Sequence, residues 1–336
     1  MNTLSVSSSP HLSGKLTTRR LMLDVLISLV TAMAVAVFFW GPRALTLTLV
    51  TIAACVLFEY LYRKLMKQSN TVGDLSACVT GTLLAFCLPA NAPYWLAIIG
   101  AFFAIVIVKQ LFGGLGKNFM NPALAARCFL FSYPTLMTTW AAPNVNLPVI
   151  GITDEYVSTI SAATPMAAMH NGLLPDATLQ QMFVGQIGGC LGEVSAAALI
   201  LGGIYLVVRK VISPRIPLWY IGTVAVITFL FPMGGQDRLE WMLYSVLGCG
   251  LLLGAIFMAT DYVTSPSTKR GQVIYAIGCG VLTVFIRYFG SYPEGVSYSI
   301  LVMNAFAWMI DKAGKPHRFG TPHFWEKSKA KEGAAK

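Results

Sequence analysis

The stretch Tyr156-Val-Ser-Thr-Ile-Ser-Ala-Ala-Thr-Pro-Met-Ala-Ala-Met169 stands near the middle of the chain, inside a polar connection that covers residues 136–182. This connection contains no Lys or Arg, and it separates two long apolar halves. Apolar runs of about 20 residues recur on both sides of it, which is typical of helices that cross a bilayer. The connection therefore divides a membrane-embedded chain in two.

Composition places the whole chain in the same class. Hydrophobic residues make up 56% of the sequence and charged residues only 11%, against roughly 25% charged in soluble proteins. We therefore predict an all-α polytopic membrane protein. The net charge of +10 does not indicate nucleic-acid binding, because the basic residues gather at the ends of the apolar runs, where they set topology.

The apolar runs predict about ten transmembrane helices in two inverted five-helix repeats. They cover residues 21–40, 45–62, 75–88, 94–112, 123–136, 184–208, 217–231, 241–260, 272–289 and 296–310. The predicted organisation is a cytoplasmic lead 1–20, a first repeat 21–136, a connection 137–182, a second repeat 183–311 and a basic cytoplasmic tail 312–336. Gly41-Pro-Arg43, between the first two runs, is expected to be a turn. The run 75–88 is too short to cross about 30 Å alone.

The positive-inside rule orients these helices. With the N-terminus in the cytoplasm, almost every basic residue between spans falls on the cytoplasmic side, and only Arg43 and Arg238 fall outside. The cytoplasmic set is Arg63, Lys64, Lys67, Lys109, Lys117, Arg209, Lys210, Arg215, Lys269 and Arg270. We therefore expect both termini in the cytoplasm and the central connection on the extracytoplasmic face.

An internal repeat is also visible. Gly81-Thr-Leu-Leu-Ala-Phe…Pro89 is similar to Gly254-Ala-Ile-Phe-Met-Ala…Pro266, and Lys109-Gln-Leu-Phe-Gly113 is similar to Arg287-Tyr-Phe-Gly290. Because each copy has an odd number of spans, the second copy is inverted relative to the first. Inverted repeats with broken helices are typical of transporters, in which the working site lies where the repeats meet.

Thr164 has a distinctive local setting. Pro165 disfavours the helical conformation for the residue before it, and proline is favoured at the first position of a helix. Thr164 is therefore expected to be the N-cap of a helix over 165–169, beside backbone N–H groups that attract phosphate. Ser161, Ala162 and Ala163 are small enough to admit a bulky group. By themselves, these residues are more often an ordinary capped helix.

Ionisable side chains at membrane depth are costly and usually functional. Glu59, Arg127, Asp261 and Arg287 lie within or at the ends of predicted spans. Taken singly, each of them is more often a satisfied interhelical pair or a snorkelling group. Asp24 and Glu193 lie close enough to span ends that we expect them to reach water.

No metal site is expected. The seven cysteines lie in or beside apolar runs, without a CxxC motif or a neighbouring histidine, so they are interpreted as small buried hydrophobes. Lys117 ends Gly113-Gly-Leu-Gly-Lys117, but no Ser or Thr follows it, so this is not a phosphate-binding loop of the P-loop type. Its glycines favour a re-entrant turn.

Four segments together resemble a known family. They are Lys109-Gln-Leu-Phe-Gly-Gly-Leu-Gly-Lys-Asn-Phe-Met-Asn-Pro-Ala123, Ser161-Ala-Ala-Thr-Pro165, Phe257-Met-Ala-Thr-Asp261 and Pro293-Glu-Gly-Val-Ser-Tyr-Ser-Ile-Leu301. In this order they resemble the D subunit of the Rnf ion-translocating electron transport complex, which is similar to the B subunit of the sodium-translocating NADH:quinone oxidoreductase. The resemblance covers about residues 15–312.

The resemblance implies FMN joined through its phosphate to the hydroxyl of Thr164, on the extracytoplasmic side. Many relatives have Gly where Ala162 or Ala163 stands here, and Thr153 and Thr159 are nearby alternative attachment sites that do not precede proline. A separate flavin transferase makes the bond in the family, so no catalytic residues are expected in this chain. A second, non-covalent flavin such as riboflavin is implied by the related quinone reductase.

The implied function is that of a subunit in a redox-driven ion translocase of the ferredoxin:NAD+ oxidoreductase type, which is not catalytic alone. The implied location is a bacterial or archaeal cytoplasmic membrane. The implied partners are other membrane and peripheral subunits, including a second covalent flavoprotein, together with Na+ or H+ and the lipid bilayer. Asp261, Glu59, Arg127 and Lys117 are candidates for an ion or coupling path. The alternative is a stand-alone channel or carrier for a small solute, with a fold like that of urea transporters.

Overall fold

The computed structural model describes residues 17–150, 161–162, 164–193, 195–248, 250–290 and 294–314. Within these ranges the chain is almost entirely helical. The first half contains α1 (Thr18–Trp40), α2 (Pro42–Leu65), η1 (Val72–Asp74), α3 (Ser76–Phe86), α4 (Tyr94–Phe102), the π-helix η2 (Phe103–Gln110), α5 (Pro122–Leu130) and α6 (Pro134–Met137).

The central connection and the second half follow. The connection contains β1 (Trp140–Ala141), β2 (Ser161–Ala162), α8 (Pro165–His170) and α9 (Leu179–Val184), and β1 pairs antiparallel with β2. The second half contains α10 (Ala196–Val208), α11 (Arg215–Leu230), α12 (Arg238–Leu247), α13 (Leu251–Leu253), the π-helix η3 (Gly254–Met258), α14 (Lys269–Phe289) and α15 (Val296–Gly314).

The first two helices show how the sequence sets element boundaries. The Thr17 side chain accepts a hydrogen bond from the backbone N–H of Arg20 and so caps the start of α1. Gly41 ends α1 with a φ of 69°, and Pro42 begins α2 at once. The predicted turn at Gly41 is therefore confirmed. With 23 residues, α1 is about 34 Å long, enough to cross the roughly 30 Å apolar core of a bilayer.

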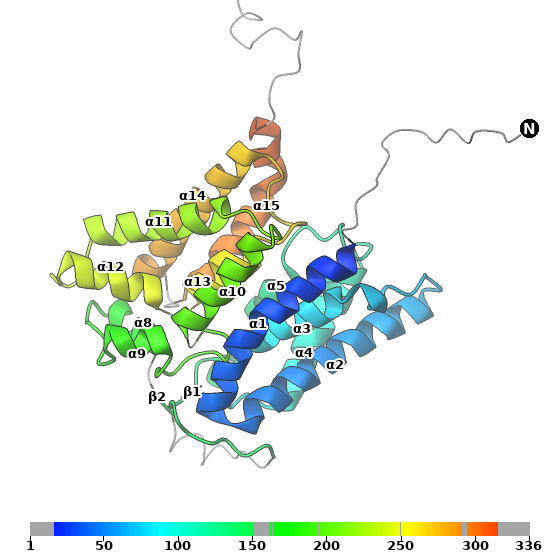
Figure 1. Ribbon diagram of the computed structural model, residues 1–336, viewed down its shortest axis with the longest axis horizontal. Coiled ribbons are helices and arrows are strands. Elements are labelled where there is room, and N and C mark those ends of the chain that lie inside the picture. The colour runs from blue at the N-terminus through cyan, green and yellow to red at the C-terminus, as the bar shows by residue number, and fades with distance from the viewer. Residues whose placement is uncertain are drawn as a thin grey trace, which may run out of the picture.

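The helices of the two halves form two groups that meet along a central seam. In the first group α2 packs on α3 and α4, and in the second α11 packs on α12 and α14. Helix α1 packs against α10, and α5 packs against α15, so these two pairs join the groups (Figure 1). Close approach of α1 and α10 depends on Gly202, where a Cβ atom would lie 2.5 Å from the backbone oxygen of Ser28.

Several helices are suited to a membrane. Helices α1, α2 and α14 are long and apolar enough to cross one, and α12 with α13–η3 forms a fourth candidate that is bent by 60°. α3, α4–η2, α10 and α11 are shorter apolar helices. Over the described residues, the structure therefore supports a helical membrane protein with several spans. The prediction of ten spans in inverted repeats stays a prediction.

The outer surfaces of these helices are apolar. On α1 the exposed side chains include Leu23, Ile27 and Val30, which recur at intervals of four and three residues and so follow one helix face. An apolar surface of this kind is unfavourable in water but matches the interior of a bilayer. The exposed faces are thus the expected contacts with lipid.

Some predicted boundaries were wrong. The apolar run 184–208 is not one helix, because α9 ends at Val184 and α10 begins only at Ala196. Gly185 has a φ of 117° and ends α9, and the segment after it turns back so that Cys190 pairs with Pro89. The run 123–136 is likewise shorter, since α5 ends at Leu130. Apolar composition alone could not separate a helix from this buried connection.

Candidate functional site

Thr164 is the N-cap of α8. Its φ of −76° and ψ of 149° are extended, and Pro165 is the first helical residue. The predicted conformation is therefore confirmed. The residue is only 4% exposed, and its side chain makes no capping hydrogen bond to α8. The hydroxyl of Thr164 is thus not committed to holding the helix start.

The residues around Thr164 are only partly described. Ser161 and Ala162 form β2 and pair with Ala141 and Trp140, so they hold the approach to Thr164 against the opposite strand. Pro165 is buried at the start of α8. Ala163, and the alternative attachment residues Thr153 and Thr159, lie outside the described residues.

Helix α8 is fixed to the second half of the chain. Met166 and Met169 pack with the buried ring of Trp241 from α12. At the other end of α8, His170 Nδ1 lies 2.8 Å from the backbone oxygen of Arg287 in α14. A Cβ atom at Gly248 would come within 2.7 Å of Met166 Sδ. These contacts hold Thr164 at the ends of α12 and α14.

A second candidate site is a cavity of about 80 Å³ between the two halves. It is bounded by the start of α1, by α3 and η2, by the start of α5, and by the segment after η3. Its polar lining residues are Ser76, Thr80, Lys109, Asn118, Asn121, Thr260, Asp261 and Tyr262. Asp261 and Lys109 therefore face the same space, although they come from opposite halves of the chain.

The charge on Lys109 is neutralised inside the protein. Lys109 Nζ lies 2.8 Å from Glu59 Oε2 and 2.6 Å from Ser76 Oγ, and Thr71 donates to Glu59 Oε1 at 2.6 Å. The Lys109 and Glu59 side chains are 2% and 1% exposed. Glu59 is therefore linked to the cavity by its ion pair with Lys109, which lines the cavity wall. Counting Lys109 among the surface charges that orient the helices was wrong.

Asp261 caps the turn that follows η3. Its carboxylate accepts hydrogen bonds from Thr264 Oγ1 at 3.1 Å and from the backbone N–H of Val263 at 3.4 Å. The side chain is thereby held at the cavity wall, on the side where α1 begins. This position agrees with the expectation that Asp261 lies at the end of a predicted span.

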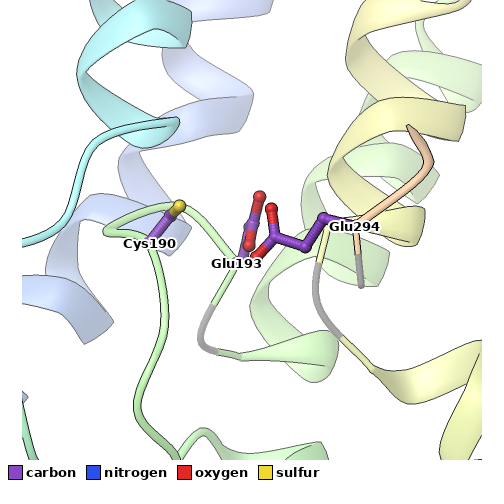
Figure 2. Close-up of side chains that lie close together, drawn as sticks. All are labelled: Cys190, Glu193 and Glu294. Atoms are coloured by element: carbon purple, nitrogen blue, oxygen red, sulfur yellow. The ribbon is translucent and has the colours of Figure 1, made fainter. Parts of the chain in front are cut away.

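Arg127 belongs to a different cluster, deep in the seam between the halves. Its guanidinium bonds Glu193 Oε1 through Nη1 at 2.8 Å, and it bonds Glu294 Oε2 through Nη2. Nη2 also lies 3.4 Å from Cys190 Sγ, and the Cys190 thiol donates to the backbone oxygen of Cys87 at 3.2 Å. Figure 2 shows the two carboxylates side by side, with Cys190 beside them.

The structure corrects two expectations about acidic residues near span ends. Glu193 is 4% exposed and does not reach water, as its place near a span end had suggested. Asp24 is also buried, where it accepts from Tyr205 and Arg209. Sequence reasoning further missed the grouping of Cys190, Glu193 and Glu294, whose ligand atoms lie within 4.8 Å of one another. A signal was present, because both glutamates adjoin glycine in apolar surroundings.

The fourth ion-path candidate, Lys117, is exposed. It lies in the turn after η2, where its side chain covers Gly113. The structure therefore brings Asp261 and the Glu59–Lys109 pair to one cavity, puts Arg127 in a separate buried cluster, and leaves Lys117 at the surface.

Comparison with known proteins gives the chain its family. A model described as the NQR2, RnfD, RnfE family matches residues 5–320. The chain is 46% identical over 332 residues to the D subunit of the Na(+)-translocating ferredoxin:NAD(+) oxidoreductase complex of Acetobacterium woodii, covering 97% of this chain and 98% of the relative.

Other relatives agree. The chain is 40% identical over 332 residues to the D subunit of the proton-translocating ferredoxin:NAD(+) oxidoreductase complex of Clostridium ljungdahlii, covering 95% of this chain and 97% of the relative. The D subunit of an ion-translocating oxidoreductase complex of Escherichia coli is 33% identical over 346 residues, with coverage of 94% and 98%. From these matches along nearly its whole length, the chain belongs to the NQR2, RnfD, RnfE family.

Proposed function

We propose that this chain is the membrane flavoprotein subunit of an ion-translocating ferredoxin:NAD+ oxidoreductase complex. It carries FMN as a phosphoester on Thr164 and couples electron transfer to the movement of Na+ or H+. The observation that carries the proposal is the buried Thr164 hydroxyl, which is free of any capping role and is held on a helix fixed to α12 and α14. The names of the relatives support the complex.

The residues around Thr164 fit such an attachment. A phosphoester needs an alcohol oxygen, and Thr164 offers one that does not cap α8 and that sits at a fixed backbone position. Pro165 holds that backbone extended, and the contacts of Met166 and His170 keep α8 from rotating. When bound, the isoalloxazine ring supplies the redox chemistry, and the protein supplies position and surroundings.

The proposed topology has ten spans in two inverted repeats. The corresponding packing of α2 with α3 and α4, and of α11 with α12 and α14, supports it. The described ends of the chain also lie on one side: Leu21 of α1 shares the cavity with Tyr262, and Asp311 of α15 accepts from the backbone N–H of Thr268. We assign this side to the cytoplasm, because the basic residues that follow α2 and precede α14 favour that side of the membrane.

The cavity between the halves is the proposed entry for the transported ion. Asp261 offers a carboxylate at its wall, while the Glu59–Lys109 pair opposite is neutral as a whole. Asn121 and Thr260 add polar oxygens. If Arg127 takes part in the ion path, that path passes the buried cluster of Arg127 with Glu193 and Glu294. Lys117 is exposed, so its charge would act only on an ion that approaches the protein from the solvent.

The proposal keeps a second, non-covalent flavin such as riboflavin, which the resemblance to the related quinone reductase implies.

The rival function, a stand-alone channel or carrier, gives Thr164 no role. It would account for the buried pairs of Lys109 with Glu59 and of Arg127 with its two glutamates, because polar groups in the seam can line a path for a solute. It would not account for the Thr164 hydroxyl, which makes no capping hydrogen bond at the start of α8. The electron-transport function accounts for both the seam and the connection.

The decisive experiment concerns the bond itself. We expect the chain, made in cells that contain a flavin transferase, to give a fluorescent band on a denaturing gel. Peptide mass spectrometry of the fragment 137–208 should show an added FMN minus water on Thr164. Thr164→Val should abolish both signals, while Thr159→Val and Thr135→Val should keep them. An unmodified fragment from wild-type protein would refute the attachment.

A further inference from the structure

The cluster around Arg127 is out of electrical balance. Two carboxylates, from Glu193 and Glu294, face a single guanidinium. The described hydrogen bonds leave one oxygen of each carboxylate, Glu193 Oε2 and Glu294 Oε1, buried without a partner. The two residues are 4% and 8% exposed. An ionised carboxylate oxygen without a donor is strongly unfavourable in such surroundings.

One added proton removes this imbalance. Two buried carboxylates at short range cannot both ionise easily, and such pairs commonly share a proton. Burial, followed by the charge of Glu193, raises the pKa of Glu294 to about 7. One carboxylate oxygen of each glutamate lies within 4.8 Å of the other, and Figure 2 shows the two groups side by side, so they compete for one proton.

We propose that Glu193 and Glu294 hold one exchangeable proton between them, so that the seam between the two halves contains a buried proton-binding site. Binding adds the proton to one carboxylate oxygen and changes the charge of the cluster with Arg127 from −1 to 0. Release reverses both changes. The site is separate from Thr164 and does not depend on FMN.

The donor set favours a proton over a metal ion. The Cys190 thiol donates its hydrogen to the backbone oxygen of Cys87, whereas a cysteine binds metal as a thiolate. Only the two carboxylates then remain as metal ligands. Hard cations in proteins take about six oxygen ligands, so this set is too small for one. The guanidinium of Arg127, in direct contact with both carboxylates, repels a further cation.

The position of the cluster makes the proton sensitive to movement of the halves. Arg127 belongs to α5 in the first half, Glu193 to the connection before α10, and Glu294 to the segment before α15. Gly250, at the bend between α12 and α13, lies against Glu193, because a Cβ atom there would be 2.7 Å from Oε1. Any shift at this bend or along the seam changes how closely the guanidinium faces the carboxylates.

Other charged and titratable groups also face the pair. They are Arg287 of α14, the Cys190 thiol in the connection, and the Cys87 thiol after α3. Arg287 is directed to the backbone oxygen of Ser245 at 2.8 Å, so its charge acts on Glu294 from a distance. Arg127 is the one cation among the described residues in direct contact with both glutamates.

The cluster is also close to the cavity that contains Asp261. Asn121 lines the cavity and caps the start of α5, and Arg127 lies six positions further along the chain. Six residues of helix correspond to roughly 9 Å. A proton held by the glutamates therefore lies within electrostatic reach of an ion in the cavity.

Infrared spectroscopy can test the shared proton directly. The full chain is purified in detergent with glutamate that is ¹³C-labelled at the side-chain carboxyl, and spectra are recorded at different pH values. We expect a label-shifted band of a protonated carboxyl group that disappears with a midpoint near pH 7. Glu294→Gln should remove this band, and Glu240→Gln, at an exposed position, should keep it.

Glu193→Gln distinguishes a shared proton from a single buried acid. With one carboxylate left to face Arg127, Glu294 should ionise, so the band should be lost near neutral pH. A band that persists unchanged in Glu193→Gln would overturn the shared site. If Glu294→Gln does not fold, the wild-type titration and Glu193→Gln remain decisive. A wild-type midpoint that moves with Na+ at constant ionic strength would indicate a cation site and overturn the proposal.

Discussion

At the scale of residues, the protein keeps charge inside an apolar body by pairing it. Lys109 is held by Glu59, and Arg127 holds Glu193 and Glu294, all with little exposure to solvent. Such pairs are weak sources of stability, but removing one partner leaves an uncompensated buried charge. The consequences of single substitutions should therefore depend on which charge remains.

The raised pKa of Glu294 makes the stability of the folded chain depend on pH. Glu294 has a pKa of about 7 in the folded chain, against about 4.3 when unfolded. Its stabilising contribution is therefore complete below about pH 4.3 and is lost as the pH rises through about 7. In detergent, we expect the thermal midpoint of the wild type, relative to that of Glu294→Gln, to fall across this window. A constant difference between the two would contradict the raised pKa.

At the scale of elements, the halves join through helices with small or polar faces. Gly202 allows α10 to touch α1, and Thr31 of α1 donates to the backbone oxygen of Ala198 in α10 at 3.0 Å. The π-helices η2 and η3 belong to opposite halves, and Lys109 projects from the first of them. Close helix packing with small residues is how membrane helices associate without a hydrophobic driving force.

The α1–α10 contact can be tested with one methyl group. Gly202→Ala would place a Cβ atom 2.5 Å from the Ser28 backbone oxygen, and such overpacking costs about 1–3 kcal/mol. We expect a lower thermal midpoint in detergent. Gly222→Ala on α11 is the control, because no atom lies within 4 Å of the added Cβ. Equal midpoints for the two variants would show that α1 and α10 are not packed this closely.

The Lys109–Glu59 pair fastens η2 to α2. Lys109→Met leaves a buried carboxylate without its cation, and breaking a buried pair in this way costs about 3–5 kcal/mol. Lys109→Met combined with Glu59→Gln removes both charges and should recover most of the lost stability. Unfolding of the two single variants and the double variant measures this coupling. A double variant as unstable as the sum of the singles would argue against direct pairing.

At the scale of the whole molecule, the two candidate sites lie at opposite ends of the helices. Helix α8 contacts the end of α14 through Arg287, whereas the cavity lies near the segment that leads into the start of α14. The 21 residues of α14 correspond to roughly 30 Å. A cofactor on Thr164 and an ion at Asp261 would thus act at opposite faces of the membrane.

Labelling in intact cells tests this orientation. Asp176→Cys lies at an exposed position in the central connection, and Lys67→Cys lies at an exposed position after α2. A membrane-impermeant maleimide should label Asp176→Cys in intact cells, and it should label Lys67→Cys only after the cells are opened. The parent chain gives the background from native cysteines. The reverse pattern would place the connection in the cytoplasm and exclude the proposed flavin position.

The sequence by itself determined the class of the protein, the division at the central connection, the turn at Gly41 and the extended Thr164 before α8. These features depend on composition and on neighbouring residues, such as Pro165, that act locally. Only the tertiary structure joined Arg127 to Glu193, 66 positions away, and to Glu294, 167 positions away. It also ended α9 at Gly185 and paired Lys109 with Glu59. Charge pairs and helix ends inside an apolar protein depend on which distant segments of the chain come into contact. The periodicity of apolar residues along the sequence does not specify those contacts.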